Sequence, residues 1–336
     1  MIQIVSNQSN PCRLPADHVR NSIDTLKIGF PLSAVKNLNL GRFDTRETTK
    51  GVDLFRHLPD QFGFARAMCV PEADSITVET SAKILGNDYR QGIHLGNLDQ
   101  YANLISKSGL FEITPETLLD ANVFRADACR TVELDYTPKQ VSEALGVLNM
   151  QKGYHFRPYP AGQVISRKAK TKNDRVVCYG KLYELTMAKS RPFTQAHPKV
   201  LDTFTPFSFR VEHQLRKLVD LRTAFDVRET TLEDVLTSTE NPVLSIVDAI
   251  AQDYNSVVSK IQAMSENVKM AERIAFVECH NRNLDAIMTT VKGLNSSKNL
   301  SGYKKKYRET IAYLETNQTK QSKNDVIIQH LKEKLA

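Results

Sequence analysis

Six short segments in the first two thirds of the chain constrain its fold more than any other feature. They alternate polar and apolar residues or are rich in β-branched and aromatic residues, which predicts half-buried strands. Successive side chains of a strand point to opposite faces of a sheet. Together the segments therefore predict one sheet. They are SIDTLKIGF (22–30), GFARAMCV (63–70), SITVETSAKIL (75–85), FRADACRTVELDY (124–136), RVVCYGKLYEL (175–185) and FSFRVEHQLRKL (207–218).

Two helices are predicted between these strands, over 98–110 and 137–150. The second begins with Thr137 as N-cap and Pro138 at the first helical position, where proline is tolerated. The order of the elements indicates an α+β fold with an antiparallel-rich central sheet and helices packed on one face. It also suggests two pseudo-related halves.

The predicted halves cover about 1–115 and 116–228, and together they form the first domain, 1–228. From residue 229 the apolar spacing becomes heptad-like, which predicts a C-terminal helical accessory domain over 229–336. Near its end a basic run lies between tyrosines. These residues either grip phosphates or form a solvated helix face. They are Lys304, Lys305, Lys306 and Arg308.

The composition indicates a soluble protein with an anionic partner. The 336 residues carry a net charge of +7, and 41% are hydrophobic, which is enough for a packed core. No apolar run reaches the ~18 residues of a membrane span, and the N-terminus lacks the pattern of a secretory signal. We therefore expect a cytoplasmic protein and no membrane partner. The five widely spaced cysteines, without a C-x-x-C pair, predict free thiols.

Three of the predicted strands each place two polar side chains on one face. Residues i and i+2 of a strand share a face, so each pair points to the same side while apolar neighbours pack on the other. Adjacent strands would bring the pairs together. The pairs are Arg125 with Asp127, Tyr179 with Lys181, and Arg210 with Glu212.

This arrangement predicts a metal ion beside a tyrosine. Asp127 and Glu212 repel each other, so both stay ionised only beside a cation, and carboxylate oxygens suit Mg²⁺ or Mn²⁺. Ionising Tyr179 at pH 7 costs roughly 4 kcal/mol, which the metal and Lys181 would reduce. Attack of Tyr179 on a phosphodiester would give a phosphotyrosyl enzyme. Each motif alone is common, however, and a polar strand face is usually just solvated.

The order of these motifs resembles the replication initiators of filamentous bacteriophages, the gene-two nickases. It is more distantly similar to the tyrosine initiators of small Gram-positive rolling-circle plasmids. Five short blocks within 23–218 carry the resemblance. They are IDTLKIGFPL (23–32), TVETSAKILGNDY (77–89), with a loop slightly shorter than in the family, FRADACRTVELDYTPKQVSEALGVL (124–148), the Tyr-x-Lys strand and FRVEHQLRK (209–217).

The resemblance implies a nickase domain over 1–228 that cuts one strand of a supercoiled double-stranded origin. Tyr179 resembles the nucleophile, Lys181 its positive partner, and Asp127 and Glu212 the metal carboxylates. Glu79 falls on the matching acidic position of the first half. The enzyme would stay joined to the 5′ end and leave a 3′-hydroxyl primer for rolling-circle replication. Origin DNA in double-stranded and single-stranded form, host helicase, single-strand binding protein and polymerase are the implied partners, in a bacterial host cytoplasm if the gene belongs to a phage.

Positive residues around the catalytic strand are expected to bind DNA, or else simply to solubilise a loop. They are Arg125, Arg167, Lys168, Lys170, Lys172, Arg175 and Arg210.

Several alternatives remain at this stage. Tyr183, on the same predicted strand face as Tyr179, could be the nucleophile. No His-x-His pair occurs, so the histidine metal site of other rolling-circle initiators is absent, and His94, His155 and His213 are expected to be surface or packing residues. An initiator that binds its origin without cutting, or a metal nuclease that activates water, would use the same composition.

Overall fold

The computed structural model describes residues 21–47, 53–57, 62–146, 154–167, 175–251, 268–294 and 300–336. Its β-strands form a single sheet of ten strands, all paired antiparallel with their neighbours. They are β1 (Ile23–Pro31), β2 (Asp44–Glu47), β3 (Asp53–His57), β4 (Phe64–Val70), β5 (Ser75–Ser81), β6 (Asn122–Glu133), β7 (Tyr154–Tyr159), β8 (Gly162–Arg167), β9 (Arg175–Gly180) and β10 (Ser208–Leu215).

The strand order shows that the sheet consists of two halves with the same topology. From one edge to the other it runs β2-β3-β4-β5-β1-β6-β10-β9-β8-β7. In each half the first strand in sequence lies innermost, the last strand pairs with it, and the other three continue outward. The halves join where β1 pairs with β6. The predicted α+β class with two related halves is thus confirmed.

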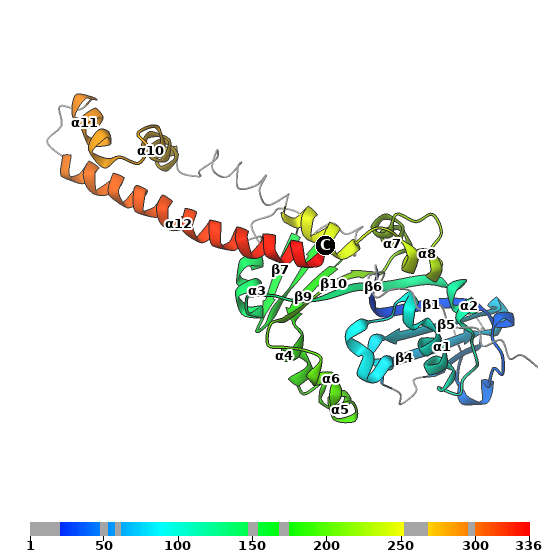
Figure 1. Ribbon diagram of the computed structural model, residues 1–336. Helices are drawn as coiled ribbons and strands as arrows, with labels where there is room; N and C mark the ends of the chain where they lie inside the picture. The colour runs from blue at the N-terminus through cyan, green and yellow to red at the C-terminus, as the bar shows by residue number, and fades with distance from the viewer. Residues whose placement is uncertain are drawn as a thin grey trace, which may run out of the picture.

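Helices surround the sheet and extend from it (Figure 1). The α-helices are α1 (Leu98–Ser106), α2 (Pro115–Leu119), α3 (Pro138–Gly146), α4 (Lys181–Thr186), α5 (Arg191–Ala196), α6 (Lys199–Asp202), α7 (Leu218–Phe225), α8 (Leu232–Thr237), α10 (Val268–Cys279), α11 (Leu284–Leu294) and α12 (Leu300–Leu335). The 3₁₀ segments are η2 (Leu32–Ala34), η3 (Leu40–Arg42), η4 (Pro71–Ala73), η5 (Ala82–Gln91) and η6 (Leu95–Asn97).

All six predicted strand segments contain a strand, but four of the strands end earlier than expected. The predicted segment 124–136 is β6 only to Glu133. The predicted segment 75–85 is β5 only to Ser81 and then becomes η5. The segment 207–218 stops at Leu215, and α7 begins at Leu218. The segment 175–185 stops at Gly180, where α4 begins. The alternation did not reveal β2, β3, β7 and β8.

The two predicted helices are present, and the first is shorter than expected. The first is α1 and the second is α3, whose predicted residues 147–150 lie outside the described part. Thr137 caps α3 as predicted: its Oγ1 accepts from the Gln140 N–H at 3.3 Å, and the Gln140 side chain accepts in return from the Thr137 N–H. The C-terminal region is helical, as its heptad-like spacing predicts.

The long helix α12 links the sheet domain to a small helical arm (Figure 1). At ~1.5 Å per residue its 36 residues span about 54 Å. Its C-terminal end packs against α3 and β6, where Ile327 and Leu331 are buried. Its N-terminal end packs against α10 and α11 around Val277 and Ile287. The basic run at 304–308 is exposed on this arm, except for Tyr307.

Alternation along the central strands gives the sheet one mostly apolar face and one polar face. On β1 and β5 the apolar face carries Leu26, Ile28, Ile76 and Val78, all buried. The polar face carries the predicted site residues and is described below. No helix within the described ranges combines the length and the apolar character that a bilayer crossing needs.

The cysteines within the described ranges are free thiols, as predicted. Cys69, Cys129 and Cys178 are buried, and Cys279 is exposed. Cys12 lies outside the described residues.

Candidate active site

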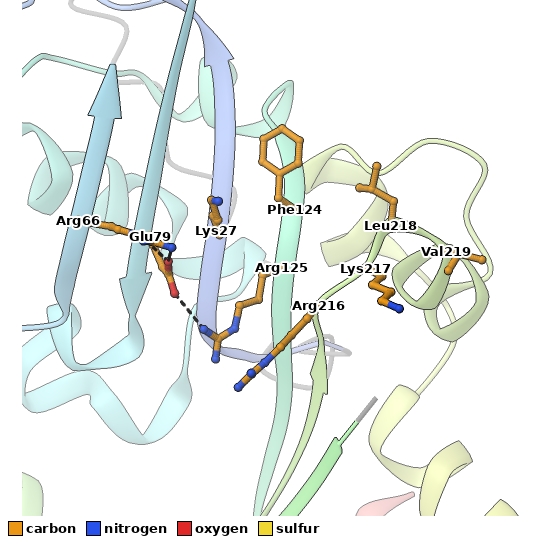
Figure 2. A pocket seen from close by; sticks show the side chains of 9 residues that line it. All are labelled: Lys27, Arg66, Glu79, Phe124, Arg125, Arg216, Lys217, Leu218 and Val219. Atoms are coloured by element: carbon orange, nitrogen blue, oxygen red, sulfur yellow. Dashed lines mark hydrogen bonds and ion pairs between the residues drawn. The ribbon is translucent and has the colours of Figure 1, made fainter. Parts of the chain in front are cut away.

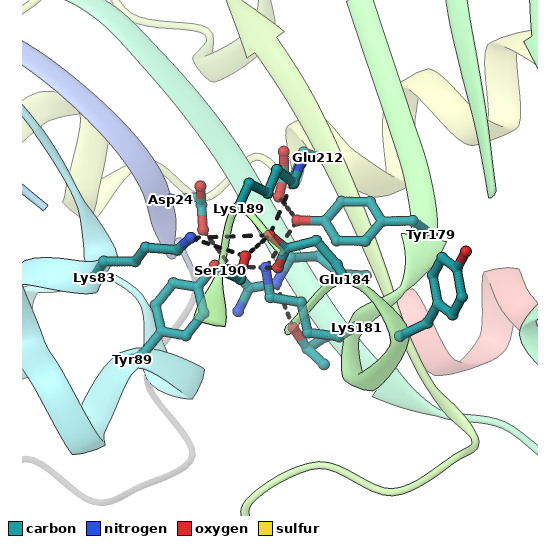
Figure 3. A network of polar contacts seen from close by, with 12 residues as sticks. Asp24, Lys83, Tyr89, Tyr179, Lys181, Glu184, Lys189, Ser190 and Glu212 are labelled. Carbon is teal, nitrogen blue, oxygen red and sulfur yellow. Dashed lines mark hydrogen bonds and ion pairs between the residues drawn. The ribbon is translucent and has the colours of Figure 1, made fainter. Parts of the chain in front are cut away.

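Tyr179 and Glu212 meet on the polar face of the sheet, as their strand positions predict. Tyr179 on β9 lies opposite Arg210 on β10, and Glu212 is two residues further along β10 on the same face. The Tyr179 hydroxyl donates a hydrogen bond to Glu212 Oε1. Both side chains are buried, with 8% and 6% of their surface exposed. The hydrogen bond between this phenol and this carboxylate is therefore shielded from bulk water (Figure 3).

Lys181 completes this group, although it lies on a helix instead of the predicted strand. As the first residue of α4, it turns back so that Nζ donates to the Tyr179 hydroxyl at 2.9 Å and contacts the Tyr89 hydroxyl. Nζ also lies 4.8 Å from the Tyr179 ring centroid, close enough for a cation–π contact. Only 1% of Lys181 is exposed. Its ammonium thus faces the phenol from which chemistry would start.

The early end of β9 has a packing cause. A Cβ on Gly180 would lie 2.8 Å from the Pro138 ring, so glycine permits close approach of α3 at the point where the chain turns. Leu182 and Leu185, three residues apart, then share one face of α4 and pack on the core. As a result Tyr183 is 42% exposed on the helix and does not share the face of Tyr179. The prediction of three aligned polar residues on a strand was wrong for Tyr183.

Burial sets the proton affinities in this group. Burial, and then the charge of Asp24, raise the pKa of Glu212 from 4.5 to about 7. Burial, and then the negative charge of Glu212, raise the pKa of Tyr179 well above 10. Burial, and then the charge of Arg210, lower the pKa of Lys181. Burial therefore favours the neutral form of each of these three side chains.

Asp24 belongs to the same group and was missed by the sequence reasoning. The pairing of β1 with β6 shifts register between Ile23 and Thr25, so Asp24 occupies a bulge. Bulges redirect side chains, and here the Asp24 carboxylate reaches Arg210, with Oδ1 2.5 Å from Nη1. An acidic residue at an alternating position shared with Leu26 and Ile28 was the available signal, but the bulge was not visible in the sequence.

Arg210 is an internal anchor, which corrects its predicted role as a DNA contact. It is fully buried. Its guanidinium binds Asp24, donates to Thr131 Oγ1 at 2.7 Å and lies 5.0 Å from the Tyr89 ring centroid. It also does not pair with Glu212, its partner in the predicted motif. Arg210 instead fixes Asp24 and Tyr89 around the site.

Asp127 lies on the same face as Glu212, one strand away and diagonally placed. It is opposite Gln214 on β10, whereas Glu212 is opposite Cys129 on β6. Arg125 holds the Asp127 carboxylate with two hydrogen bonds, at 3.0 Å from Nε and 2.6 Å from Nη2. Burial nevertheless raises the pKa of Asp127.

Glu79, a predicted metal ligand, does not contact Tyr179, Lys181 or Glu212. It lies on β5, three strands from β10, and its carboxylate binds Arg66 at 2.8 Å and Arg125 at 2.9 Å.

A second carboxylate, Glu184, holds Lys181 in place (Figure 3). Its Oε2 lies 3.1 Å from Lys181 Nζ, and its Oε1 accepts from Ser190 Oγ at 2.6 Å. Lys83 lies 3.9 Å away. Although burial works in the opposite direction, Lys181 and Lys83 bring the pKa of Glu184 down to about 2. Glu184 is therefore a permanent counter-ion, unlike Glu212.

The carboxylates on this face are of the chemical kind that Mg²⁺ or Mn²⁺ prefers. Asp24, Asp127 and Glu212 offer hard carboxylate oxygens, and burial raises the pKa of Asp127 and of Glu212. Within the described ranges no three acidic, histidine or cysteine side chains are arranged as a ready metal site. Each of the three carboxylates instead contacts a protein partner, so an ion would compete with Arg210, Arg125 and Tyr179.

The remaining predicted DNA-binding residues are only partly described. Arg175 is exposed at the start of β9. Arg125 lines an open groove discussed below. The side chain of Arg167 and the residues Lys168, Lys170 and Lys172 lie outside the described part of the chain.

The histidines have structural positions, as expected. His94 caps η6 by accepting from the Gly96 N–H at 3.1 Å, and His155 is exposed. His213 Nδ1 contacts the Pro242 carbonyl at 3.1 Å, on the face opposite Glu212.

Comparison with known proteins gives little beyond this geometry. No family model matches the sequence, and no curated protein matches it. One solved structure that is similar is a rolling circle replication initiator protein from Geobacillus stearothermophilus, with 12% sequence identity and a TM-score of 0.33. The match covers 70% of this chain and 85% of that chain. A similarity of this size carries no weight for function, so the proposal below starts from the site residues.

Proposed function

We propose that this protein is a replication initiator that nicks one strand of DNA at a double-stranded origin by tyrosine attack. The observation that carries the proposal is the position of the Tyr179 hydroxyl between Glu212, which accepts its proton, and Lys181, which donates to its oxygen at 2.9 Å. A structural tyrosine needs only one partner. A base and a cation on the same phenol oxygen are what a nucleophile requires.

In the first step Glu212 would take the phenol proton. Its pKa of about 7 makes it partly ionised at neutral pH and a better base than an exposed glutamate. The Tyr179 oxygen would then form a bond to the phosphorus of a phosphodiester, and the bond from phosphorus to the 3′ oxygen would break. The products are a 5′-phosphotyrosyl enzyme and, after the 3′ oxygen gains a proton, a 3′-hydroxyl primer.

Lys181 would stabilise the phenolate as the proton leaves. Its ammonium is buried and is fixed by Glu184 at 3.1 Å, so it does not have to reorient during the reaction. Tyr89 contacts the same ammonium and lies against Arg210. We therefore assign Glu184 and Tyr89 to positioning Lys181.

Asp24 and Asp127 are the residues that would hold Mg²⁺ or Mn²⁺ while Glu212 acts as the base. Binding of the ion by Glu212, the metal role that the resemblance implies, is the alternative, because an ion on Glu212 would lower its pKa and remove the base. When bound, the ion would neutralise charge on the phosphate oxygens and lower the proton affinity of nearby groups. Burial, and then the negative charge of Glu212, raise the pKa of Tyr179 well above 10, so positive charge from the ion and from Lys181 would help the phenol to lose its proton. Host helicase, single-strand binding protein and polymerase are the partners that the family resemblance implies.

The test uses the full chain, Mn²⁺ or Mg²⁺, and a supercoiled plasmid carrying the origin of its own replicon. We expect nicked circles with protein attached to the 5′ end in a form that survives denaturation. Tyr179→Phe should abolish the attachment. Tyr183→Phe is the matched control and should retain it, because Tyr183 is exposed on α4.

Three outcomes would contradict the proposal. Nicking without attached protein that persists in Tyr179→Phe would indicate hydrolysis by activated water. Origin binding without nicking in either metal would indicate an initiator that only binds. Attachment lost in Tyr183→Phe alone would move the nucleophile to α4.

A further inference from the structure

A groove of about 650 Å³ lies on the polar face of the sheet, where its two halves join at β1 and β6 (Figure 2). Strands β1, β4, β5 and β6 and the start of α7 supply its walls. It is lined by five cationic side chains, one carboxylate and three apolar side chains. These are Lys27, Arg66, Arg125, Arg216, Lys217, Glu79, Phe124, Leu218 and Val219.

The groove carries a surplus of positive charge. Its carboxylate, Glu79, is already bound by Arg66 and Arg125. Lys27, by contrast, has no ion-pair partner among the described residues. Arg216 is exposed, and its described contact is with the Gln214 amide at 3.1 Å. Two cations therefore face the groove with their charge available to an anion.

The aromatic ring of Phe124 lines the groove and is exposed, because a bulge in β6 turns it toward this face. The pairing of β1 and β6 shifts register between Lys27 and Ile28, which leaves Phe124 in a bulge. The ring lies over Gly29: a Cβ on that glycine would come within 2.6 Å of Phe124 Cε2. Phe124 is 39% exposed. A glycine under a bulged phenylalanine fixes an apolar platform beside the cations.

The groove is continuous with the candidate active site. Arg125 lines the groove and also binds Asp127, and the charge of Arg216 lowers the proton affinity of the same carboxylate. Asp127 lies on β6, two strands from Tyr179 on β9. By register Asp127 also lies four residues further along the sheet than Tyr179. At ~4.8 Å between strands and ~3.4 Å per residue, the two positions are about 17 Å apart. A single strand that leaves Tyr179 across the sheet would therefore reach the groove within a few nucleotides.

We propose that this groove binds the single strand of DNA that adjoins the scissile phosphate, with phosphates at Lys27 and Arg216 and a base stacked on Phe124. The assignment of the strand rests on the proposed nicking function. Single-stranded DNA fits better than duplex because stacking on Phe124 requires an exposed base face, which a duplex keeps between its own base pairs. Cations beside an aromatic platform are the combination that binds single strands regardless of sequence.

The chain contains no tryptophan, which allows a direct test. Phe124→Trp in the full-length Tyr179→Phe background, with metal chelated, places one tryptophan in the groove of a protein that cannot cut. Oligothymidylate should quench its fluorescence, and a duplex of the same length should not. Leu95→Trp is the control: Leu95 is 37% exposed in η6, just before α1, which packs on the other face through the bond between Tyr101 and Thr80. Its fluorescence should not change.

Anisotropy of labelled oligothymidylate separates the stacking and charge contributions. Phe124→Ala should weaken binding about five- to 150-fold without changing the salt dependence. Lys27→Ala should reduce the slope of log affinity against log salt by about 0.7, the loss of one phosphate contact. Lys107→Ala, an exposed lysine at the end of α1, should leave both unchanged. Melting curves must show that each variant is folded.

The proposal is overturned if Phe124→Ala binds normally while folded, or if duplex quenches Phe124→Trp as well as the single strand does. Displacement of the oligonucleotide by oligoglutamate at equal charge concentration would identify a general polyanion surface and would also overturn it. Neither measurement needs cleavage. If nicking fails and the groove binds the oligonucleotide, the nucleophile is rejected and the groove assignment stands. If nicking succeeds and the groove does not bind, the groove assignment is rejected and the nucleophile stands.

Discussion

The opposite pKa shifts of the buried Glu212 and the half-buried Glu184 give a test of the site that does not depend on activity. Glu212 has a pKa raised from 4.5 to about 7, whereas Glu184 has a pKa lowered from 4.5 to about 2. Replacing each glutamate by the isosteric glutamine should therefore change the free energy of unfolding in opposite directions. The difference between the two changes in unfolding free energy reports the charge environment of each glutamate.

For Glu212 the folded pKa lies above the unfolded value, so its contribution to stability is full below pH 4.5 and is lost as pH rises through about 7. At ~1.36 kcal/mol for each pH unit, the full loss is about 3 kcal/mol. About 1 kcal/mol of this is already lost at pH 5.5, and about 2 kcal/mol is lost between pH 5.5 and 8.5. Glu212→Gln removes the titrating group and should escape this loss.

The assay is denaturant unfolding of the wild type and Glu212→Gln at pH 5.5 and 8.5, in the presence of a chelator. The advantage of the variant over the wild type should grow by about 2 kcal/mol between the two pH values. Since both proteins share every other titrating group, the comparison removes their contributions. An advantage that is the same at both pH values would refute the assignment of a buried, undercompensated carboxylate.

Glu184→Gln is the matched control. Its folded pKa of about 2 lies below 4.5, so its stabilisation is present above pH 4.5 and is lost only as pH falls toward 2. The variant should be less stable than the wild type by up to about 3 kcal/mol, equally at pH 5.5 and 8.5. A pH-dependent difference between these two values would show that Lys181 and Lys83 are not its fixed counter-ions.

Two further variants separate chemistry from binding. Lys181→Met should lower the rate of covalent attachment roughly 100-fold or more, because it removes the cation on the phenol oxygen, while oligonucleotide affinity stays unchanged because Lys181 is buried. Equal losses in attachment and in affinity would contradict this role. Glu79→Gln should leave the Mn²⁺ concentration dependence of nicking unchanged and should raise oligonucleotide affinity by releasing Arg66 and Arg125. A shift of the Mn²⁺ dependence to higher concentrations would instead make Glu79 a metal ligand.

The central strands could be predicted because one face of each is buried. Burial on one side forces alternation, and alternation is visible in a sequence. The strands that were missed lie toward the two edges of the sheet, β2 and β3 at one edge and β7 and β8 at the other. Edge strands bury less and include charged residues and proline, as in DTRE and YHFRPY. Their pattern is correspondingly weak.

The local sequence was ambiguous where β9 turns into α4. In YGKLYEL, the polar residues Tyr179, Lys181 and Tyr183 alternate as in a strand, while Leu182 and Leu185 are spaced as in a helix. Tertiary packing decides between the two, because Pro138 approaches Gly180 and the two leucines pack on the core. The contact between Tyr179 and Lys181 was nevertheless expected, and the structure contains it, although on a different backbone.

Pairing partners of charged residues were the least predictable part of the site. Arg125 does bind Asp127 two residues away, as the shared strand face suggests. Arg210, in the equivalent motif, does not pair with Glu212. It binds Asp24, which lies 186 residues earlier in the chain. That choice depends on a one-residue bulge in β1, which has no sequence signal of its own. Local spacing fixes which face a residue lies on but not which neighbour it pairs with.

The repeated topology gives the two proposed activities, DNA binding and strand cutting, separate places on one sheet. Glu79 on β5 and Glu212 on β10 lie on equivalent strands of the two halves. Two arginines neutralise Glu79, and the surrounding cations leave a surplus of positive charge that favours phosphates. Glu212 instead faces a phenol, and an arginine placed against it would lower its pKa and remove the base. Binding and proton transfer therefore need opposite charge balance, and placing them on adjacent halves of one sheet face allows both along a single strand of DNA.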